Sequence, residues 1–546
     1  MKIVEKMVRL HDNGYGTSYR STCSCGHTAV SMPRPMQINV AEYLERGALA
    51  SCPNKTAIIE GANRYTFAEL ERYAKRCATL LIQRTQRTGA PIAVFLPKGA
   101  TTVFADLGII YSGGIYSNLD VKSPPQRIKN ILANLGPALI ITSKALLASV
   151  VELGVAQSQV LLVDDLFDDT IVVDSAGITA RLEQVIDTDP LCIINTSGST
   201  GTPKGVVMHH RSVIDFMDWV MDRLGLDGSE TIGSLSPFYF DIYTLELYLS
   251  LAKGSTLVVI PDELAMFPAK LVAFLSEMEV SFLFWVPTIM VNIANLGLLG
   301  SADLGKLKKI FFAGEVFPTK HLNIWRRHLP DAVFVNLYGP IEITVDCTYF
   351  VVDRELRDDE PLPIGYACRN TSILILDEND QPAATGQPGE LCVRGSSLAL
   401  GYWNDPEKTA KAFVQNPLNK HYPELIYRTG DVVSRNDRGE ILFLGRKDFQ
   451  IKHLGYRIEL GEIEHLVTSI GLVDNACVLY HRERKEITLF FEAKEPVQPA
   501  AIRQGLAGVL PKYMLPTVFR QMEALPRNPN GKIDRNGLSA LLEPQP

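Results

Sequence analysis

Short apolar runs that alternate with helix-like segments constrain the fold more than any other feature of this chain. Residues 91–96, 138–142, 159–163 and 255–260 are apolar stretches of strand length. Residues 67–83 instead place apolar side chains three and four positions apart, as an amphipathic helix does. Continuous apolar strands belong in parallel sheets that helices cover on both faces. The pattern therefore predicts an α/β architecture.

The pattern changes after about residue 365. Segments such as 372–380 and 439–446 are short strands punctuated by Gly, Asn and Asp, which is typical of antiparallel hairpins. A chain of 546 residues also exceeds a single ordinary core. We expect an N-terminal extension at 1–36, and a large domain at 37–446 with mixed and parallel sheets, flanking helices and a small β-barrel-like part. A small mobile α+β domain is expected at 447–546.

Composition excludes several classes of partner. The net charge of −7 gives no basic surface of the kind that binds nucleic acid. No apolar run reaches the ~20 residues of a membrane helix, and the N-terminus lacks the apolar core of a signal peptide. The sequence predicts a cytoplasmic protein with neither a nucleic-acid nor a membrane partner.

A loop rich in glycine and hydroxyl residues follows the apolar residues 191–194. Residues 196–205 read TSGSTGTPKG. The glycines let the backbone approach a ligand closely, and the hydroxyl and N–H groups can donate hydrogen bonds to phosphate oxygens. The spacing does not match the P-loop, because no Gly-Lys-Ser/Thr follows at the required distance. The loop predicts phosphate binding.

This loop resembles the phosphate-loop signature of the adenylate-forming superfamily, which includes acyl-CoA synthetases, luciferases and the amino-acid-activating domains of nonribosomal peptide synthetases. Further family motifs occur in the expected order: RYTFAEL (64–70), NLYGPIEIT (336–344), GELCVRGSSLALGYWNDPEKT (389–409), YRTGD (427–431), GRKDFQIKHLGYRIELGEIE (445–464), LPKYMLP (510–516) and NPNGKIDR (528–535). The wording of RIELGEIE and NGKIDR resembles peptide-synthetase adenylation domains more than acyl-CoA ligases. Among these domains, the chain resembles the stand-alone L-prolyl-carrier protein ligases.

The resemblance implies a reaction in which a carboxylate attacks the α-phosphate of ATP and expels pyrophosphate. Lys532 would bridge the carboxylate and the α-phosphate, and Glu342 would hold Mg²⁺, a hard cation that prefers oxygen ligands. Asp448 would be a hinge that swings the C-terminal domain, so that Gly455 faces the site in a second orientation. The implied nucleotide site consists of Thr196, Ser197, Gly198, Ser199, Thr200, Gly201, Lys204, Gly314, Glu315, Val316, Asn336, Leu337, Tyr338, Gly339, Asp431, Phe443 and Arg446. Asp431 would accept the ribose hydroxyls, and Tyr338 would stack on adenine.

The resemblance also implies an amino acid as the substrate. Asp241 would hold the α-ammonium group, for which an acyl-CoA ligase has no need; a turn or helix cap is its structural alternative. The implied substrate site consists of Asp241, Ile242, Leu245, Phe284, Phe311, Ala313, Leu337, Val345, Asp346 and Lys532. A buried lone carboxylate such as Asp346 is costly unless it is paired, protonated or facing a polar substrate group. If Asp346 faces the substrate, serine, a hydroxylated proline or a short basic amino acid fits; if it points away, proline or alanine fits. L-proline is the predicted substrate.

The acyl acceptor is expected to be a separate carrier protein, because only fourteen residues follow Lys532. The predicted cofactors are ATP and Mg²⁺, with the phosphopantetheine arm of that carrier as acceptor. An acyl- or aryl-CoA ligase of the same fold is the alternative activity. A degenerate, non-enzymatic relative is suggested only by Ile341, where the family usually has threonine. Losing one neutral donor costs about 0.5–1.5 kcal/mol, so Ile341 is predicted to be a tolerated departure.

Overall fold

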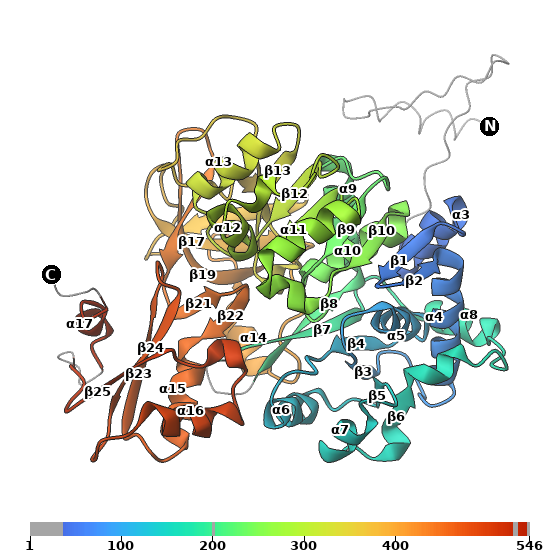
Figure 1. Ribbon diagram of the computed structural model, residues 1–546, viewed down its shortest axis with the longest axis horizontal. Helices are drawn as coiled ribbons and strands as arrows, with labels where there is room; N and C mark the ends of the chain where they lie inside the picture. The colour runs from blue at the N-terminus through green and yellow to red at the C-terminus, as the bar shows by residue number, and fades with distance from the viewer. Residues whose placement is uncertain (1–36, 199–202, 528–532, 543–546) are drawn as a thin grey trace. The chain divides into compact units, whose positions relative to one another are not determined.

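The described residues, 37–198, 203–527 and 533–542, form two large sheets of mostly parallel strands in the computed structural model (Figure 1). The first sheet has the spatial order β15 (Tyr366–Ala367), β14 (Thr348–Val351), β13 (Val333–Tyr338), β12 (Lys309–Phe312), β11 (Phe282–Trp285), β9 (Thr231–Ser234), β10 (Thr256–Val259), β1 (Thr56–Glu60) and β2 (Asn63–Thr66). The second has the order β6 (Val160–Leu162), β5 (Leu139–Thr142), β3 (Pro91–Phe95), β4 (Ile115–Asn118), β7 (Pro190–Thr196) and β8 (Lys204–His209). The four strands expected from apolar runs are confirmed as β3, β5, β6 and β10.

Helices connect these strands and cover the sheets. They are α2 (Ala41–Tyr43), α3 (Leu49–Ser51), α4 (Phe67–Ile82), α5 (Ala100–Tyr111), α6 (Pro125–Leu135), α7 (Leu147–Glu152), α8 (Ser175–Leu182), α9 (His210–Arg223), α10 (Ile242–Lys253), α11 (Pro268–Glu277), α12 (Pro287–Asn295) and α13 (Thr319–His328); α14 (Pro406–Ala412) instead lies between two strands of the antiparallel sheet. The helix expected at 67–83 is α4. It starts at a capping box, because the Thr66 hydroxyl accepts from the Glu69 N–H and the Glu69 carboxylate accepts from the Thr66 N–H.

One hydrophobic cluster joins the two sheets. Ile92 and Val94 of β3, Ile232 of β9 and Leu257 of β10 belong to it, together with the buried faces of α5 and α10. Strands buried on both faces are what the continuous apolar runs predict. The carboxyl ends of strands from both sheets are thereby held against each other.

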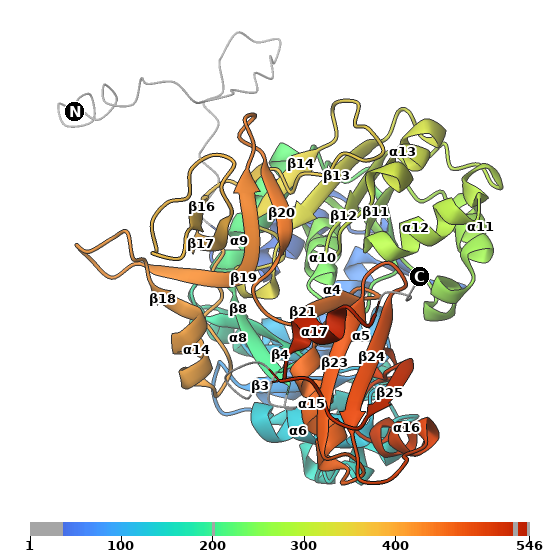
Figure 2. The ribbon, with the colours of Figure 1, turned by 90° about the vertical axis from the view of Figure 1, so that its left-hand side faces the viewer.

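An antiparallel sheet follows and corresponds to the predicted β-barrel-like part. Its strands are β16 (Thr371–Leu376), β17 (Gly389–Gly395), β18 (Phe413–Gln415), β19 (Leu425–Arg435) and β20 (Ile441–Arg446). The remaining residues, red in Figures 1 and 2, form the hairpin β21 (Gln450–His453) and β22 (Tyr456–Glu459), the sheet β23 (Asn475–His481), β24 (Glu486–Glu492) and β25 (Val518–Met522), and helices α15 (Leu460–Ser469), α16 (Pro499–Ala507) and α17 (Arg535–Ser539).

The predicted fold class is confirmed. The residues after β20 have a hydrophobic cluster of their own, which runs from Ile458 to Met514, as a small α+β domain requires. The boundary at 446 and the mobility of this part stay predictions. Among the helices of the described residues, none combines the length and the apolar character that crossing a membrane requires.

Candidate active site

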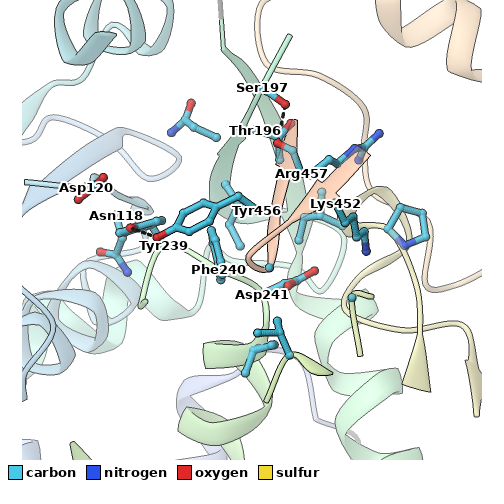
Figure 3. A pocket seen from close by; sticks show the side chains of 18 of the residues that line it. Asn118, Asp120, Thr196, Ser197, Tyr239, Phe240, Asp241, Lys452, Tyr456 and Arg457 are labelled. Atoms are coloured by element: carbon cyan, nitrogen blue, oxygen red, sulfur yellow. Dashed lines mark hydrogen bonds between the residues drawn. The ribbon is translucent and has the colours of Figure 1, made fainter. Parts of the chain in front are cut away.

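A cavity of about 140 Å³ lies where the carboxyl ends of strands from both large sheets meet the β21–β22 hairpin (Figure 3). Asn118 at the end of β4 and Thr196 at the end of β7 line one side. Phe284 of β11 and residues after β12 and β13 line another, and Lys452, Gly455, Tyr456 and Arg457 of the hairpin line a third. Ligands of open α/β sheets bind at this edge, so the cavity is the candidate active site.

Asp241 sits at the start of α10 with its carboxyl group on the cavity wall. Its side chain makes no hydrogen bond that caps the helix, although hydrogen bonds from the backbone of Asp241 and Ile242 lower its pKa. Burial raises the pKa of Asp241 to about 6, although the charge of Lys452 opposes the rise. Figure 3 shows Lys452 extending from the hairpin toward the side of the cavity where Asp241 lies.

Asp346 also lines the cavity and is only 2% exposed. Its Oδ2 atom is buried without a hydrogen-bond partner among the described residues. Burial, reinforced by the nearby charge of Asp241, raises the pKa of Asp346 well above its usual range, while Lys452 acts in the opposite direction. The wall therefore contains an acidic group with one oxygen that no described residue pairs.

The predicted side-chain pocket is reproduced in part. Ile242, Phe284, Ala313 and Val345 line the cavity together with the two acids. Leu245, Phe311 and Leu337 instead lie in the hydrophobic core, each at most 1% exposed, and are not among the lining residues. Lys532, like Ser199, Thr200 and Gly201, lies outside the described residues. The described part of the pocket is small and mostly apolar apart from its acids.

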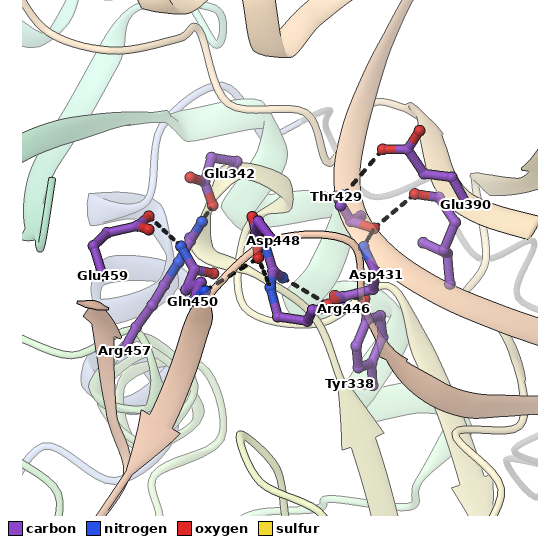
Figure 4. Close-up of polar contacts among 12 residues, drawn as sticks. Tyr338, Glu342, Glu390, Thr429, Asp431, Arg446, Asp448, Gln450, Arg457 and Glu459 are labelled. Carbon is purple, nitrogen blue, oxygen red and sulfur yellow. Dashed lines mark hydrogen bonds and ion pairs between the residues drawn. The ribbon is translucent and has the colours of Figure 1, made fainter. Parts of the chain in front are cut away.

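Asp431 is the centre of the expected ribose site (Figure 4). It accepts a hydrogen bond from the Tyr338 hydroxyl and one of 2.6 Å from Arg446 Nη1. Arg446 in turn donates through Nε and Nη2 to the two carboxylate oxygens of Asp448, both at 2.6 Å. The predicted hinge residue and the predicted ribose-binding residues thus form one ion-paired network, and the Phe443 ring lies 6.4 Å from that of Tyr338.

Glu342 is completely buried and is bound by two cations. Its Oε2 accepts from Arg457 Nη1 at 2.7 Å, and its Oε1 accepts from Lys204 Nζ at 3.3 Å and from the Tyr402 hydroxyl at 2.8 Å. Burial alone would raise the pKa of Glu342, but the charges of Arg457 and Lys204 hold it well below its usual range. The carboxylate is therefore ionised, with both oxygens in use.

Glu342 offers the ionised carboxylate that Mg²⁺ prefers, but both of its oxygens already accept hydrogen bonds from protein groups. Protein sites usually hold Mg²⁺ through one or two carboxylates plus phosphate oxygens, and an ionised carboxylate beside a phosphate loop suits that. No cluster of three or more His, Cys, Asp or Glu is found in the described ranges, so a site made by protein ligands alone is not seen there. Metal binding at Oε2 would require Arg457 to move away.

The phosphate loop contacts the C-terminal part of the chain. The Ser197 hydroxyl donates to the Arg457 carbonyl at 2.7 Å and accepts from the Glu459 N–H at 3.2 Å. The Gly198 N–H donates to Glu462 at 3.3 Å, and Glu462 is ion-paired with Arg127 at 2.6 Å. The hydroxyl of Thr196, which lines the cavity, is buried without a partner among the residues described. A ligand in the cavity could therefore accept a hydrogen bond from it.

The hairpin places Gly455 against the cavity. Its N–H donates to Glu315 Oε1 at 2.9 Å, and Glu315 also accepts from the Thr288 N–H and hydroxyl. Gly455 has a φ of +82°, and a Cβ atom there would lie 2.9 Å from the Val286 side chain, so a larger residue does not fit. Gly455 thus lies against the cavity, as the sequence expects for the second half-reaction; the existence of two orientations stays a prediction.

The other expected nucleotide residues are close by. Gly314 and Gly339 line the cavity, and Asn336 Nδ2 donates to the Pro363 carbonyl at 2.7 Å. Val316 is 68% exposed. The sequence did not predict Lys452 and Arg457 as site residues. Both are cations inside the family motif GRKDFQIKHLGYRIELGEIE, and their position there could have indicated a role in the site.

Comparison with known proteins agrees with this geometry. The model of the family described as AMP-binding enzyme matches residues 44–403. Tyrocidine synthase 1 of Brevibacillus parabrevis is 31% identical over 490 residues, which cover 89% of this chain and 43% of that protein. The chain thus spans less than half the length of this relative.

Solved structures are similar over the same region. The crystal structure of IdnL1 has a TM-score of 0.76 and 26% identity, covering 89% of this chain and 99% of that one. The nonribosomal peptide synthetase FmoA3 has a TM-score of 0.68 and 29% identity, covering 76% of this chain and 43% of that one.

Proposed function

This chain belongs to the family of AMP-binding enzymes, and we propose that it activates a small α-amino acid. The carboxylate would attack the α-phosphate of ATP, pyrophosphate would leave, and the aminoacyl group would pass from AMP to the phosphopantetheine thiol of a separate carrier protein. The observation that carries this proposal is the carboxyl group of Asp241, which lies on the cavity wall and makes no hydrogen bond that caps α10.

An ammonium group is the natural partner for Asp241. A buried carboxylate is costly when unpaired, and the substrate ammonium would supply both charge and hydrogen-bond donors. A fatty or aryl acid would leave the same carboxylate without a partner. This difference favours an amino acid over the substrates of an acyl- or aryl-CoA ligase, the second candidate function.

The nucleotide would lie along the network that extends from the phosphate loop to Asp431. Asp431 and Arg446 would bind the ribose, Thr196 and Ser197 the phosphates, and Lys532 the forming bond between carboxylate and α-phosphate. Glu342 would hold Mg²⁺, which supplies positive charge to the phosphate oxygens. Arg457 must leave Glu342 for that arrangement, so adenylation would need the hairpin to withdraw.

Transfer to the thiol would follow with the hairpin in the orientation described above. Gly455 then packs on Val286 beside the cavity and leaves no side chain in the way of a narrow thiol arm. Likeness to a nonribosomal peptide synthetase structure supports a carrier as the acceptor.

The substrate would be small. The cavity of about 140 Å³ is below the ~300 Å³ at the lower end of common ligand pockets. The residue pattern resembles that of prolyl-carrier protein ligases, so L-proline, serine and alanine are the substrates to test.

ATP–pyrophosphate exchange over the twenty amino acids, short fatty acids and aryl acids tests the proposal. We expect exchange with one or a few small amino acids and none with acids that lack an amine. Exchange only with acids lacking an amine would contradict amino acid activation and favour a CoA ligase. Absence of exchange with every acid, from protein that still binds ATP, would favour a non-enzymatic relative.

Ile341→Thr is expected to change the exchange turnover by less than about tenfold. Ile341 is 6% exposed and lies on the cavity wall, so a hydroxyl there would add one neutral donor, worth about 0.5–1.5 kcal/mol. Steady-state kinetics with varied ATP checks this, with Ile343→Thr, buried in the same turn but absent from the cavity wall, as the control. A hundredfold gain in the Ile341 variant would show that isoleucine cripples the native site.

A further inference from the structure

Asp346, an acid on the cavity wall, allows an inference about the substrate. This inference rests on the proposed amino acid activation. The Oδ2 atom of Asp346 is buried and has no partner among the described residues, and its side chain lies on the cavity wall. Phe284, Ala313 and Val345 line the same cavity and cannot donate a side-chain hydrogen bond. Among the described residues, Lys452 lines it too and is the cation whose charge acts on this carboxyl group, so a donor on the ligand could pair with Oδ2.

The backbone holds Asp346 in this position. Thr344 and Val345 have φ values of +57° and +62°, a left-handed conformation that costs non-glycine residues about 1–3 kcal/mol each. On the other side, Gly339 packs so closely that a Cβ atom there would lie 2.5 Å from the Asp346 Cα atom. A strained turn on one side and a glycine on the other keep the acid on the wall, which indicates that its placement serves the ligand.

Asp106 shows how the same chain treats a buried acid with a structural role. Its Oδ2 atom accepts two hydrogen bonds of 3.0 Å, from Asn118 Nδ2 and from the Tyr243 hydroxyl, while its Oδ1 atom is buried without a partner among the described residues. Asp106 does not line the cavity. The Oδ2 atom of Asp346 has no such bond among the described residues, and its side chain lies on the cavity wall.

We propose that Asp346 selects an amino acid whose short side chain carries a hydroxyl or amine donor, and that this donor binds the Asp346 carboxyl group. Proline and alanine would leave Oδ2 unpaired in an apolar wall, whereas a hydroxylated proline, serine or a short diamino acid would pair it. A site built to bond a substrate donor rejects the analogue that lacks it. The substrate class is thus narrower than "small amino acid".

The charges in the cavity agree with a donor at this place. Asp241 would be engaged by the α-ammonium group, and Lys452 faces both acids without a hydrogen bond to either in the described part of the chain. Burial keeps the Asp346 carboxyl protonated at higher pH than usual, and a protonated carboxyl can both accept from and donate to a hydroxyl. A side-chain amine would instead bind its ionised form.

Pyrophosphate exchange with matched substrate pairs tests this selection on the full-length enzyme. The pairs are proline against 4-hydroxyproline, alanine against serine, and alanine against 2,3-diaminopropionate. We expect the donor-bearing member of at least one pair to have a kcat/KM about ten- to hundredfold higher. The serine and diaminopropionate arms distinguish a hydroxyl from an amine.

Variants separate selection from folding. In Asp346→Val the preference should disappear or reverse, and in Asp346→Asn, which can still accept and donate, it should persist in part for the hydroxyl. Glu246→Gln is the matched control, because Glu246 is also buried with one unpaired oxygen but bonds to Ser234 away from the cavity; its substrate ratios should equal those of the native enzyme.

The outcomes are distinct. A native enzyme that prefers proline or alanine, with ratios unchanged in both Asp346 variants, would overturn the proposed role of Asp346 and leave amino acid activation standing. Absence of exchange with every amino acid would instead overturn the proposed function itself. If Asp346→Val does not fold, the Asp346→Asn ratios and the native pairs still decide.

Discussion

Asp241→Asn is expected to raise the KM for the amino acid in pyrophosphate exchange by about a hundredfold or more. The variant keeps the shape of the side chain and removes the charge that would hold the α-ammonium group in a buried cavity. Removing one partner of a buried, hydrogen-bonded charge pair costs about 2–5 kcal/mol, and each 1.4 kcal/mol is about tenfold. The KM for ATP should be almost unchanged, which makes it the internal control.

The pH dependence of the native enzyme provides a second measure of the same group. Asp241 has a pKa raised to about 6 by burial, in surroundings that include Lys452, Glu342 and Asp346. Only the ionised form binds an ammonium group, so affinity is present above pH 6 and is lost as the pH falls through that value. The KM for the amino acid should rise about tenfold per unit below pH 6, and Asp241→Asn should lack this rise. A native KM that is flat from pH 5 to 8 would remove Asp241 from this role.

Glu342→Gln is expected to lower the exchange turnover by about a hundredfold or more. The amide cannot supply the charge that we propose for Mg²⁺, and a bound metal contributes several kcal/mol of charge stabilisation. The variant also leaves Lys204 and Arg457 without their shared carboxylate, and breaking a buried pair costs about 3–5 kcal/mol of stability. Thermal unfolding must therefore be measured beside the kinetics.

Arg457→Gln is the matched variant, because it alters the other half of the same ion pair. We expect exchange within about threefold of the native rate, since Arg457 must leave Glu342 before adenylation. Thioester formation with pantetheine as the thiol should fall about tenfold, because a hydrogen bond to a charged group that holds the hairpin in place is worth about 1.5–3 kcal/mol. Equal losses in both assays, or a loss in exchange alone, would show that the pair has no part in separating the two steps.

Local sequence patterns predicted the helices and strands, but they did not predict the contacts between residues far apart in the sequence. The helix at 67–83 and the strand at 91–96 were readable because their periodicity and apolar character are properties of a few neighbouring residues. The partners of Glu342 were not, because Arg457 lies 115 residues away in sequence. That contact depends on where the hairpin packs, and no local pattern specifies it.

The direction of Asp346 could not be predicted for a different reason. Both a wall-facing and an outward-facing acid were compatible with the motif NLYGPIEIT and the residues after it. The choice is made by positive φ values at Thr344 and Val345, which are threonine and valine and so carry none of the glycine signal by which such turns are usually recognised. Lys532 and residues 199–202 lie outside the described residues, and their roles stay predictions.

The strained turn at Thr344 and Val345 makes position 346 a suitable site for changing the substrate specificity by substitution. Because the turn and Gly339 fix the Cα atom of that residue, a substitution there changes the chemistry of the wall while the frame around it stays in place. A small library at this single codon, with basic, polar and apolar members, would sample new substrates without rebuilding the scaffold. The strained backbone thus holds position 346 in place, so that its side chain can be exchanged while the rest of the cavity wall is kept.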